Sequence, residues 1–228
     1  MVYDFCAGRG GKYPHAFLKD WSGTLVVDAY SGYDATLSLD GRFTAHCLAH
    51  ARRKYDELVK ANASEVAKQA VLRIAWLYRV EAVAKALTAE QRLQMRLERS
   101  KPMWEELHVW LQLERQRVPD GSAIAKAIDY SLNHWAGLGR FLLDGAVPID
   151  NTHIENQIRP WALGRRNWLF IGSQLAGERA AVVMSLPQSA KLNGHEPWAY
   201  LKDVLTRLPT QLNSRIEELL PHRWQRAD

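Results

Sequence analysis

Two carboxylates in this sequence stand where a chemical reaction could use them. Asp28 directly follows the apolar run at 24–27, and Glu155 lies near the start of the segment IDNTHIENQIRPWALGRRNW at 149–168. Side chains at the carboxyl ends of parallel strands face the ligand crevice of an α/β sheet, so Asp28 is well placed to bind a metal ion. Asp34, in the loop after Asp28, is a weaker candidate for the same role.

Each carboxylate also has a purely structural explanation. The stretch DAYSGYD that begins at Asp28 is typical of a turn, where aspartate is common. Thr152 and Glu155 have the spacing of a capping box, and Glu155 precedes Arg159 by four residues, the spacing of a helical ion pair. From the residues alone, a turn residue and a helix cap are the favoured interpretations.

The segment HCLAHARRK at 46–54 offers soft metal ligands. Cys47 and His50 are separated by two residues, and His46 and His50 by three, which is compatible with zinc. A structural zinc site needs four ligands, and the sequence supplies no convincing further pair. Zinc binding by Cys47 and His50 stays an open alternative.

Two basic segments without acidic residues flank the candidate carboxylates. The first runs from Gly41 to Tyr55, and the second lies between Glu155 and Glu178. Cations without nearby carboxylates suit contacts with the phosphates of a nucleic acid, although most such runs are solvated faces. The cations concerned are Arg52, Arg53, Lys54, Arg159, Arg165 and Arg166.

Strand signals occupy residues 1–55, which must position Asp28. The runs are VYDF at 2–5, GTLVV at 23–27 and GRFTAHCL at 41–48, separated by glycine-bearing turns. The continuous apolar run before Asp28 is typical of a strand buried on both faces.

Residues 56–146 are predicted to form a bundle of three or four helices. Ser64 and Ser122 are predicted N-caps. Thr88 and Gln91 have the spacing of a capping box, and Pro102 suits a first helical turn.

Residues 147–228 contain the Glu155 segment and two further predicted helices. Pro160 and Pro187 are expected to end or kink the helices that contain them, because proline lacks an N–H and clashes with the preceding turn. Strands, then helices, then a helix with a carboxylate near its start predict an α/β sheet interrupted by a helical insertion.

Composition restricts the class of protein. The 228 residues are 47% hydrophobic and carry a net charge of +5, which permits an acidic partner without requiring one. Cys6 and Cys47 alone do not indicate a disulfide framework. The first twenty residues lack the apolar core of a signal peptide, and no apolar run approaches the roughly 20 residues of a membrane helix. We expect a soluble cytoplasmic protein without membrane contacts.

Four motifs give the chain a family resemblance. GTLVVDAYSGYD, CLAHARRKYDEL, IDNTHIENQIRPWALGRRNWLFIGS and AKLNGHEPWAYLKDVLTRLP resemble, in this order, the catalytic region of the insertion sequence 66 family of transposases. The resemblance implies an incomplete ribonuclease-H-like α/β sheet, with its first strands missing and a large all-helical insertion before the glutamate-bearing helix. It also implies an Asp-Asp-Glu active site in which Asp28 is the second aspartate and Glu155 the glutamate.

The first aspartate of such a site would lie on a strand preceding VYDF, which this sequence does not contain. Asp4 lies on what resembles the third strand and is a poor substitute. The implied cofactor is Mg²⁺ or Mn²⁺, because a pair of such ions clamps the attacking and leaving oxygens of a phosphoryl displacement. Without the first aspartate we expect the metal to bind weakly, if at all.

The function implied by the resemblance is DNA transposition, in which water first nicks DNA and the freed 3′-hydroxyl then attacks a target strand. The implied partners are double-stranded DNA at the element ends and at the target, further copies of the chain, and element-encoded accessory proteins; the implied location is the nucleoid. One alternative is an inactive DNA-binding remnant. Another, outside the family, is a helical structural protein in which Glu155 only caps its helix.

Overall fold

The computed structural model describes the backbone of residues 1–168 and 171–226, and the side chains of these residues except 165–168. It divides into two compact units. The larger unit is Gly10–Asn156, and the smaller unit combines Met1–Arg9 with Gln157–Asp228.

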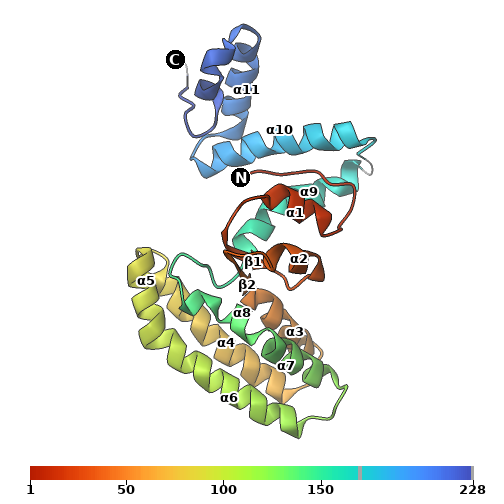
Figure 1. The fold of residues 1–228 in the computed structure, drawn as a ribbon, viewed down its shortest axis with the longest axis vertical. Coiled ribbons are helices and arrows are strands. Elements are labelled where there is room, and N and C mark those ends of the chain that lie inside the picture. Colours follow the sequence, from red (N-terminus) through yellow and green to blue (C-terminus); the bar gives the residue numbers. More distant parts are fainter. Residues whose placement is uncertain (169–170, 227–228) are drawn as a thin grey trace. The chain divides into compact units, whose positions relative to one another are not determined.

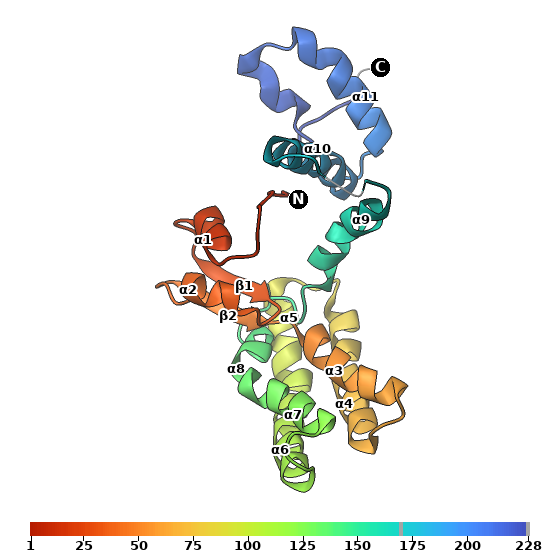
Figure 2. The ribbon, with the colours of Figure 1, turned by 90° about the vertical axis from the view of Figure 1, so that its right-hand side faces the viewer.

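A pair of parallel strands begins the larger unit. β1 (Gly23–Val27) pairs with β2 (Arg42–His46), so that Val27 lies opposite His46 at the carboxyl ends of both strands. Figure 2 shows the two strands side by side. Both strands were predicted from the sequence, and both are confirmed.

Short helices precede and connect the two strands. They are α1 (Lys12–Leu18), the 3-10 turn η1 (Ser31–Tyr33) and α2 (Asp34–Leu37). The guanidinium of Arg42, buried at the start of β2, donates to the carbonyl oxygens of Trp21, Thr36 and Lys19. These bonds tie the segment before β1 and the connection between the strands to the start of β2. The bond to the fully buried Thr36 satisfies a backbone acceptor that has no access to water.

The predicted strand at Val2–Phe5 does not form. Instead, this segment runs in extended form beside α10 (Gln174–Leu192) in the smaller unit (Figure 1). The Tyr3 backbone N–H donates to Ser185 Oγ at 2.9 Å, and the Tyr3 hydroxyl donates to the Gln157 carbonyl. Side chains of a helix thus take the hydrogen bonds that a neighbouring strand would have taken.

Helices make up the rest of the larger unit (Figure 1). Their bounds are α3 (Leu48–Lys60), α4 (Glu65–Ala84), α5 (Ala89–Met95), the π-helical turn η2 (Arg96–Ser100), α6 (Lys101–Arg117), α7 (Ala123–Asn133), α8 (Trp135–Leu138) and the 3-10 turn η3 (Arg140–Leu142).

The predicted helix starts in this region are confirmed. Ser64 and Ser122 each accept a backbone N–H three residues later, and Thr88 and Gln91 form the reciprocal bonds of a capping box. Pro102 lies in the first turn of α6. Each of these signals depends only on residues within one turn.

Aromatic residues fill the core of these helices. Trp104 on α6 is 5% exposed and stacks on Trp135 with ring centroids 3.8 Å apart, while Phe141 packs edge-on against it at 5.9 Å. Tyr55 on α3 is fully buried, and its hydroxyl lies 2.8 Å from Ser131 Oγ on α7. The core therefore packs α3, α6 and α7 against α8 and η3, which follow α7 in the chain.

A fully buried arginine holds η2 against the chain that leads to α9 (Thr152–Trp168). The Arg96 guanidinium forms two 2.7 Å bonds with the carboxylate of Glu81 on α4. It also donates to the carbonyls of Phe141, Asp144 and Val147 at 2.9–3.0 Å. These bonds satisfy a buried charge and three backbone acceptors together.

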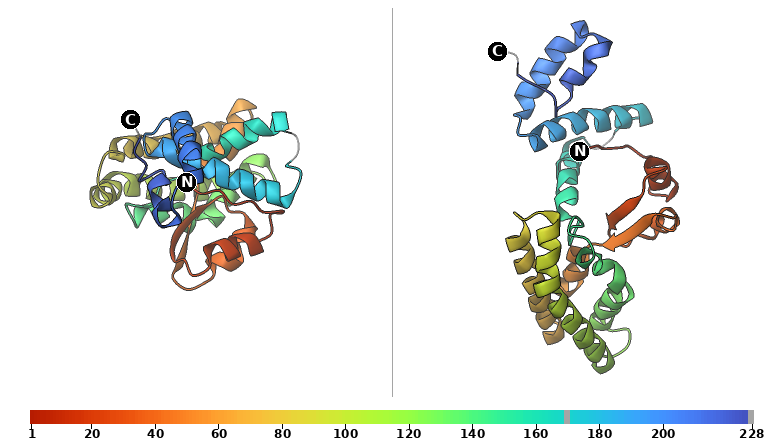
Figure 3. Two further views of the ribbon diagram at one scale, coloured as in Figure 1. Left: turned by 90° about the horizontal axis from the view of Figure 1, so that it is seen from above. Right: turned by 60° about the vertical axis from the view of Figure 1, so that its left-hand side comes forward.

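The smaller unit is helical in its described part. Besides the carboxyl-terminal part of α9, it contains α10, α11 (Pro197–Arg207), η4 (Leu208–Thr210) and η5 (Asn213–Leu219) (Figure 3). Its core is formed by Ala190, Tyr200, Val204, Leu219 and Trp224.

The prolines do not end their helices. α9 continues through Pro160 and α10 through Pro187, so neither helix ends at its proline, and the expected kink at each stays a prediction. α10 buries Ala181 before its proline and Ala190 after it. Packing on both sides of Pro187 offsets the hydrogen bond that the proline cannot donate. No helix in the described part of the chain is long and apolar enough to cross a membrane.

Candidate active site

Asp28 stands at the carboxyl end of β1, as the sequence predicted. Its side chain is half-buried, and the next residue, Ala29, has a φ of 49°, in the left-handed region that non-glycine residues rarely adopt. The Cys47 N–H donates to the Val27 carbonyl at 3.0 Å, which ties the end of β2 to the residue before Asp28. The carboxylate is thus held on a sharp turn between the ends of two strands.

Histidines from two segments lie close to Asp28. The rings of His46, at the end of β2, and His134, at the end of α7, have centroids 4.8 Å apart. Burial lowers the pKa of His46, and the His134 ring lowers it further, while the charges of Asp34 and Asp28 act in the opposite direction. The lowered pKa favours the neutral form of His46, and the charge of the Asp28 carboxylate acts on its ring.

Glu155 lies in the first turn of α9, close to His50. His50 Nε2, on α3, is 3.5 Å from Glu155 Oε1. His50 Nδ1 is buried and has no hydrogen-bond partner within the described residues, so Nε2 is the nitrogen that serves Glu155. The Glu155 side chain is 38% exposed, which leaves its carboxylate accessible to a ligand.

The predicted capping box at Thr152 and Glu155 is wrong. α9 already begins at Thr152, and the Glu155 N–H donates to the Asn151 carbonyl at 3.0 Å. The Thr152 N–H is instead accepted by the Asp150 carboxylate at 3.0 Å. Since Asp150 takes over the bond at the helix start, the cap does not explain why a glutamate stands at position 155.

The start of α9 is clamped to α3 and α4. The Leu48 N–H donates to the Ile149 carbonyl at 3.1 Å, and the Tyr78 hydroxyl donates to the Asp150 carboxylate at 2.7 Å. Together with the His50–Glu155 contact, these bonds fix the position of the first turn of α9, which carries Glu155. Residues of the predicted helical segment thereby help to position the candidate carboxylate.

Zinc binding at Cys47 and His50 receives no support from the geometry. Cys47 is 1% exposed, and burial raises the pKa of its thiol, which keeps it protonated. Among the residues whose positions are described, no three or more His, Cys, Asp or Glu side chains are grouped so as to hold a metal. This also means that Asp28, Asp34 and Glu155 do not form such a group by themselves.

The predicted DNA contacts differ in their accessibility. Arg53 and Lys54 on α3 are exposed, Arg52 is half-buried, and Arg159 is exposed on α9. The Lys54 ammonium lies 4.4 Å from the centre of the Tyr130 ring. The side chains of Arg165 and Arg166 lie outside the described residues.

Sequence reasoning missed other residues beside Asp28. His134 and Arg140 come from the end of the helical segment, and together with Tyr30 and His46 they line a pocket next to this carboxylate. No local pattern could have found them, because more than a hundred residues of chain separate Tyr30 from His134.

Comparison with known proteins adds sequence relatives but no template for the fold. A protein of Sinorhizobium fredii, y4hP, is 39% identical over 243 residues, covering 99% of this chain and 44% of that protein. Another protein of that organism, y4jD, is 37% identical over 232 residues, covering 98% of this chain and 45% of that protein. The chain thus spans less than half the length of these relatives. No solved structure matches.

Two family descriptions match the chain. Residues 1–179 match the model for the transposase IS66 family, and residues 185–222 match the model for the IS66 C-terminal element. The first match contains β1, the helical segment and both candidate carboxylates, and the second contains α11. The chain belongs to the IS66 family of transposases.

Proposed function

We propose that this chain acts in DNA transposition and contributes Asp28 and Glu155 to metal-dependent cleavage and transfer of DNA strands. Membership of the IS66 transposase family is the observation that carries the proposal. The position of Asp28 at the end of β1 and the exposed carboxylate of Glu155 in the first turn of α9 support it. The proposed partner is double-stranded DNA, at the element ends and at the target.

The described residues do not by themselves fit a complete metal site. Carboxylate oxygens are the ligands that Mg²⁺ and Mn²⁺ prefer, and Asp28 and Glu155 can supply them. However, no group of three or more such ligands occurs within the described part of the chain. We infer that Asp28 and Glu155 need a further carboxylate before a divalent metal binds tightly.

The residues around the carboxylates have roles that do not depend on a metal. His50 restrains the Glu155 carboxylate, and the bonds of Asp150 hold the first turn of α9 in place. Arg53 and Lys54 are exposed cations that can bind phosphates of the duplex. We further propose self-association, because in the described residues β1 and β2 pair only with each other and neither outer edge has a paired strand.

Nicking of DNA that carries element ends tests the catalytic part of the proposal. If Asp28 and Glu155 supply ligands, any Mg²⁺- or Mn²⁺-dependent nicking by the chain should fall by at least about a hundredfold in Asp28→Asn and in Glu155→Gln, because metal and transition-state contacts are lost together. Asp120→Asn, which alters an exposed carboxylate on the loop after α6, is the control. Nicking that survives in both site variants would contradict these roles.

A second candidate function is DNA binding without catalysis. Within the described residues no three or more His, Cys, Asp or Glu side chains are grouped so as to hold a metal, which favours it. The same nicking assay separates the two candidates, since tight DNA binding without metal-dependent nicking supports the second one.

The salt dependence of DNA binding tests the predicted phosphate contacts. Replacing both Arg53 and Lys54 with glutamine should weaken duplex binding and make the slope of log K against log[salt] shallower by about 2, because each phosphate contact contributes roughly 0.9 to it. Fluorescence anisotropy with a labelled duplex measures both quantities. Lys101→Gln with Arg117→Gln removes the same charge from exposed positions on α6 and should leave the slope unchanged. Equal slopes for all three proteins would exclude Arg53 and Lys54 as phosphate contacts.

A further inference from the structure

α4 carries apolar side chains on two of its faces. One face packs into the core of the larger unit through residues such as Ile74 and Leu77. The other face bears Leu72, Trp76 and Val83, whose side chains are 57%, 53% and 60% exposed. Apolar side chains gathered along one helix face, unlike scattered ones, are typical of a surface that a partner covers.

The exposed residues of α4 have the spacing of a seam between two helices. We call this set the α4 seam; it consists of Gln69, Leu72, Trp76, Arg79 and Val83, all exposed. They follow one another at intervals of three and four residues, the heptad spacing by which two helices pack along their length. A groove of about 560 Å³ beside the seam has Met103 and Glu106 of α6 on its other side. The groove therefore has room for side chains of a second helix.

The α4 seam is complementary to itself when two copies lie antiparallel. Leu72 and Val83 have their midpoint between residues 77 and 78, and Trp76 and Arg79 have the same midpoint. A two-fold axis at this midpoint places Leu72 on Val83 of a second copy. The same axis places Trp76 on Arg79 of that copy, and each contact occurs twice.

The charges of α4 favour the antiparallel arrangement over a parallel one. The Arg79 guanidinium already lies 4.2 Å from the centre of the Trp76 ring in its own chain, and an aromatic ring attracts a cation on either face. A parallel pair would instead set Arg79 against Arg79. Glu65 lies in the first turn of α4 and Lys85 directly follows its last turn, so antiparallel helices bring these opposite charges to the same end of the pair.

We propose that the α4 seam binds the α4 seam of a second copy of this chain, antiparallel and with Leu72 against Val83. The inference rests on the self-association proposed above and assigns it to a surface other than the sheet edges. The strip from Gln69 to Val83 is about 20 Å long and about 10 Å wide, well under the roughly 800 Å² per partner of a stable interface. We therefore expect a weak dimer with a Kd on the order of 0.1 mM, so that micromolar solutions contain mainly the monomer.

Sedimentation equilibrium of the full chain between about 10 and about 500 µM tests the proposal on both sides of the expected Kd. Leu72→Glu and Val83→Lys should each weaken association at least about tenfold, because each places a charge in an apolar contact. The matched controls are Leu113→Glu and Val109→Lys, the same substitutions at side chains of α6 that are 47% and 56% exposed. Both controls should leave the Kd unchanged.

The double variant with Leu72→Glu and Val83→Lys tests the antiparallel register. It should regain most of the lost affinity, because each introduced carboxylate then meets an introduced ammonium of the other copy. The two positions lie about 16 Å apart along one helix, so the introduced charges cannot pair within a single chain. Recovery therefore requires a second copy in the proposed orientation.

Three other outcomes would count against the inference. Single variants that dimerise like the parent chain would overturn it and leave self-association to another surface, such as the sheet edges. Weaker association in the single variants without recovery in the double variant would overturn the antiparallel pairing. A chain that stays monomeric up to about 500 µM would contradict both the inference and the proposed self-association, and would leave the α4 seam to a different occupant.

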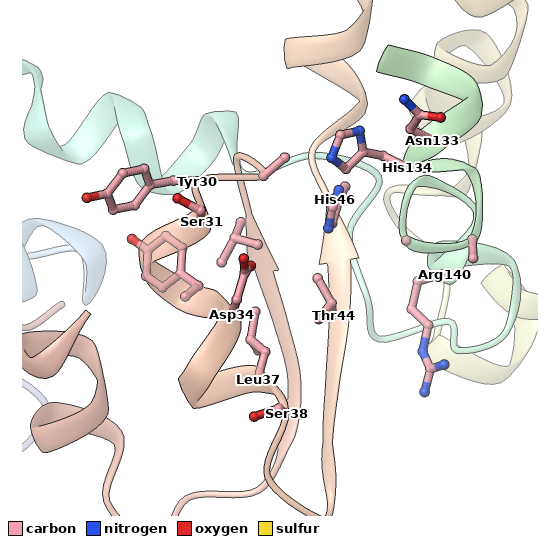
Figure 4. Close-up of a pocket in the computed structure, with 15 residues that line it drawn as sticks. Tyr30, Ser31, Asp34, Leu37, Ser38, Thr44, His46, Asn133, His134 and Arg140 are labelled. Carbon is pink, nitrogen blue, oxygen red and sulfur yellow. The ribbon is translucent and has the colours of Figure 1, made fainter. Parts of the chain in front are cut away.

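The seam variants also keep this test separate from the proposed action on DNA. The pocket beside Asp28 is lined by residues of β1, β2, their connection and the α7–η3 region (Figure 4). Substitutions in the α4 seam therefore leave its lining unchanged. Duplex binding by these variants, measured below the Kd of the dimer, tests the proposed function independently of the dimer.

Discussion

Replacing Arg96 with methionine is expected to lower the free energy of unfolding of the larger unit by about 3–5 kcal/mol. The substitution would leave the Glu81 carboxylate, whose side chain is 14% exposed, without its partner. It would also strip the carbonyls of Phe141, Asp144 and Val147 of a donor. An unpaired buried charge and several unsatisfied acceptors are each costly, which places this change among the most damaging in the chain.

Urea denaturation followed by circular dichroism measures the effect of Arg96→Met. Lys101→Met is the control, because it also replaces a cation by methionine, at a side chain that is 53% exposed and lies 4.0 Å from Glu105, itself 65% exposed. We expect the control to cost less than about 1 kcal/mol, as exposed ion pairs do. If the two variants lost similar stability, the buried network of Arg96 would not have the importance that its geometry indicates.

Truncating Trp104 to alanine is expected to cost about 3–5 kcal/mol, because it removes the largest side chain from the centre of the helical core. Trp104 stacks on Trp135 and meets Phe141 edge-on, so the cavity would be lined by rings held in place by their own helices. The surrounding side chains can relax little into such a cavity, so the loss of stability should be among the larger ones seen for core truncations.

Thermal unfolding by calorimetry measures the effect of Trp104→Ala. Trp76→Ala provides the same truncation at a tryptophan that is 53% exposed on α4. Its main loss is the contact with the Arg79 guanidinium, so we expect a cost of about 1 kcal/mol or less. A large loss of stability in both variants would mean that the surface of α4 is packed against something in solution.

The sequence predicted features of this fold that depend on short stretches of chain. The caps at Ser64, Thr88 and Ser122 are confirmed because a cap needs only residues within one helical turn. The strand at Val2–Phe5 failed because its pattern is compatible with any extended segment, and the serines of α10 provide its hydrogen bonds. Pro187 did not end its helix. The packing of α10 outweighs the hydrogen bond that proline cannot donate, and the sequence shows only the second of these two effects.

In the candidate site, too, features set by neighbouring residues could be predicted, and contacts between residues far apart in the sequence could not. Asp28 could be placed from the apolar run before it, because a strand ends where that run ends. The contact of His50 with Glu155 could not be predicted, since the two residues lie on helices that the whole helical segment separates in sequence. The burial of Arg96 could not be predicted either, because its carbonyl acceptors lie about fifty residues further along the chain.

The buried network of Arg96 has a consequence for how this architecture can be altered. Its guanidinium joins the Glu81 carboxylate on α4 to the carbonyls of Asp144 and Val147, which lie on the stretch of chain that leads into α9. The helices between β2 and α9 therefore cannot be deleted without loss of these bonds. Deleting them and joining the ends would also remove Tyr78, the hydroxyl partner of Asp150. Shortened relatives of this chain should therefore keep α4 and η2 even when they lose other turns of the helical segment. These two elements carry the side chains that hold the stretch of chain leading to Glu155.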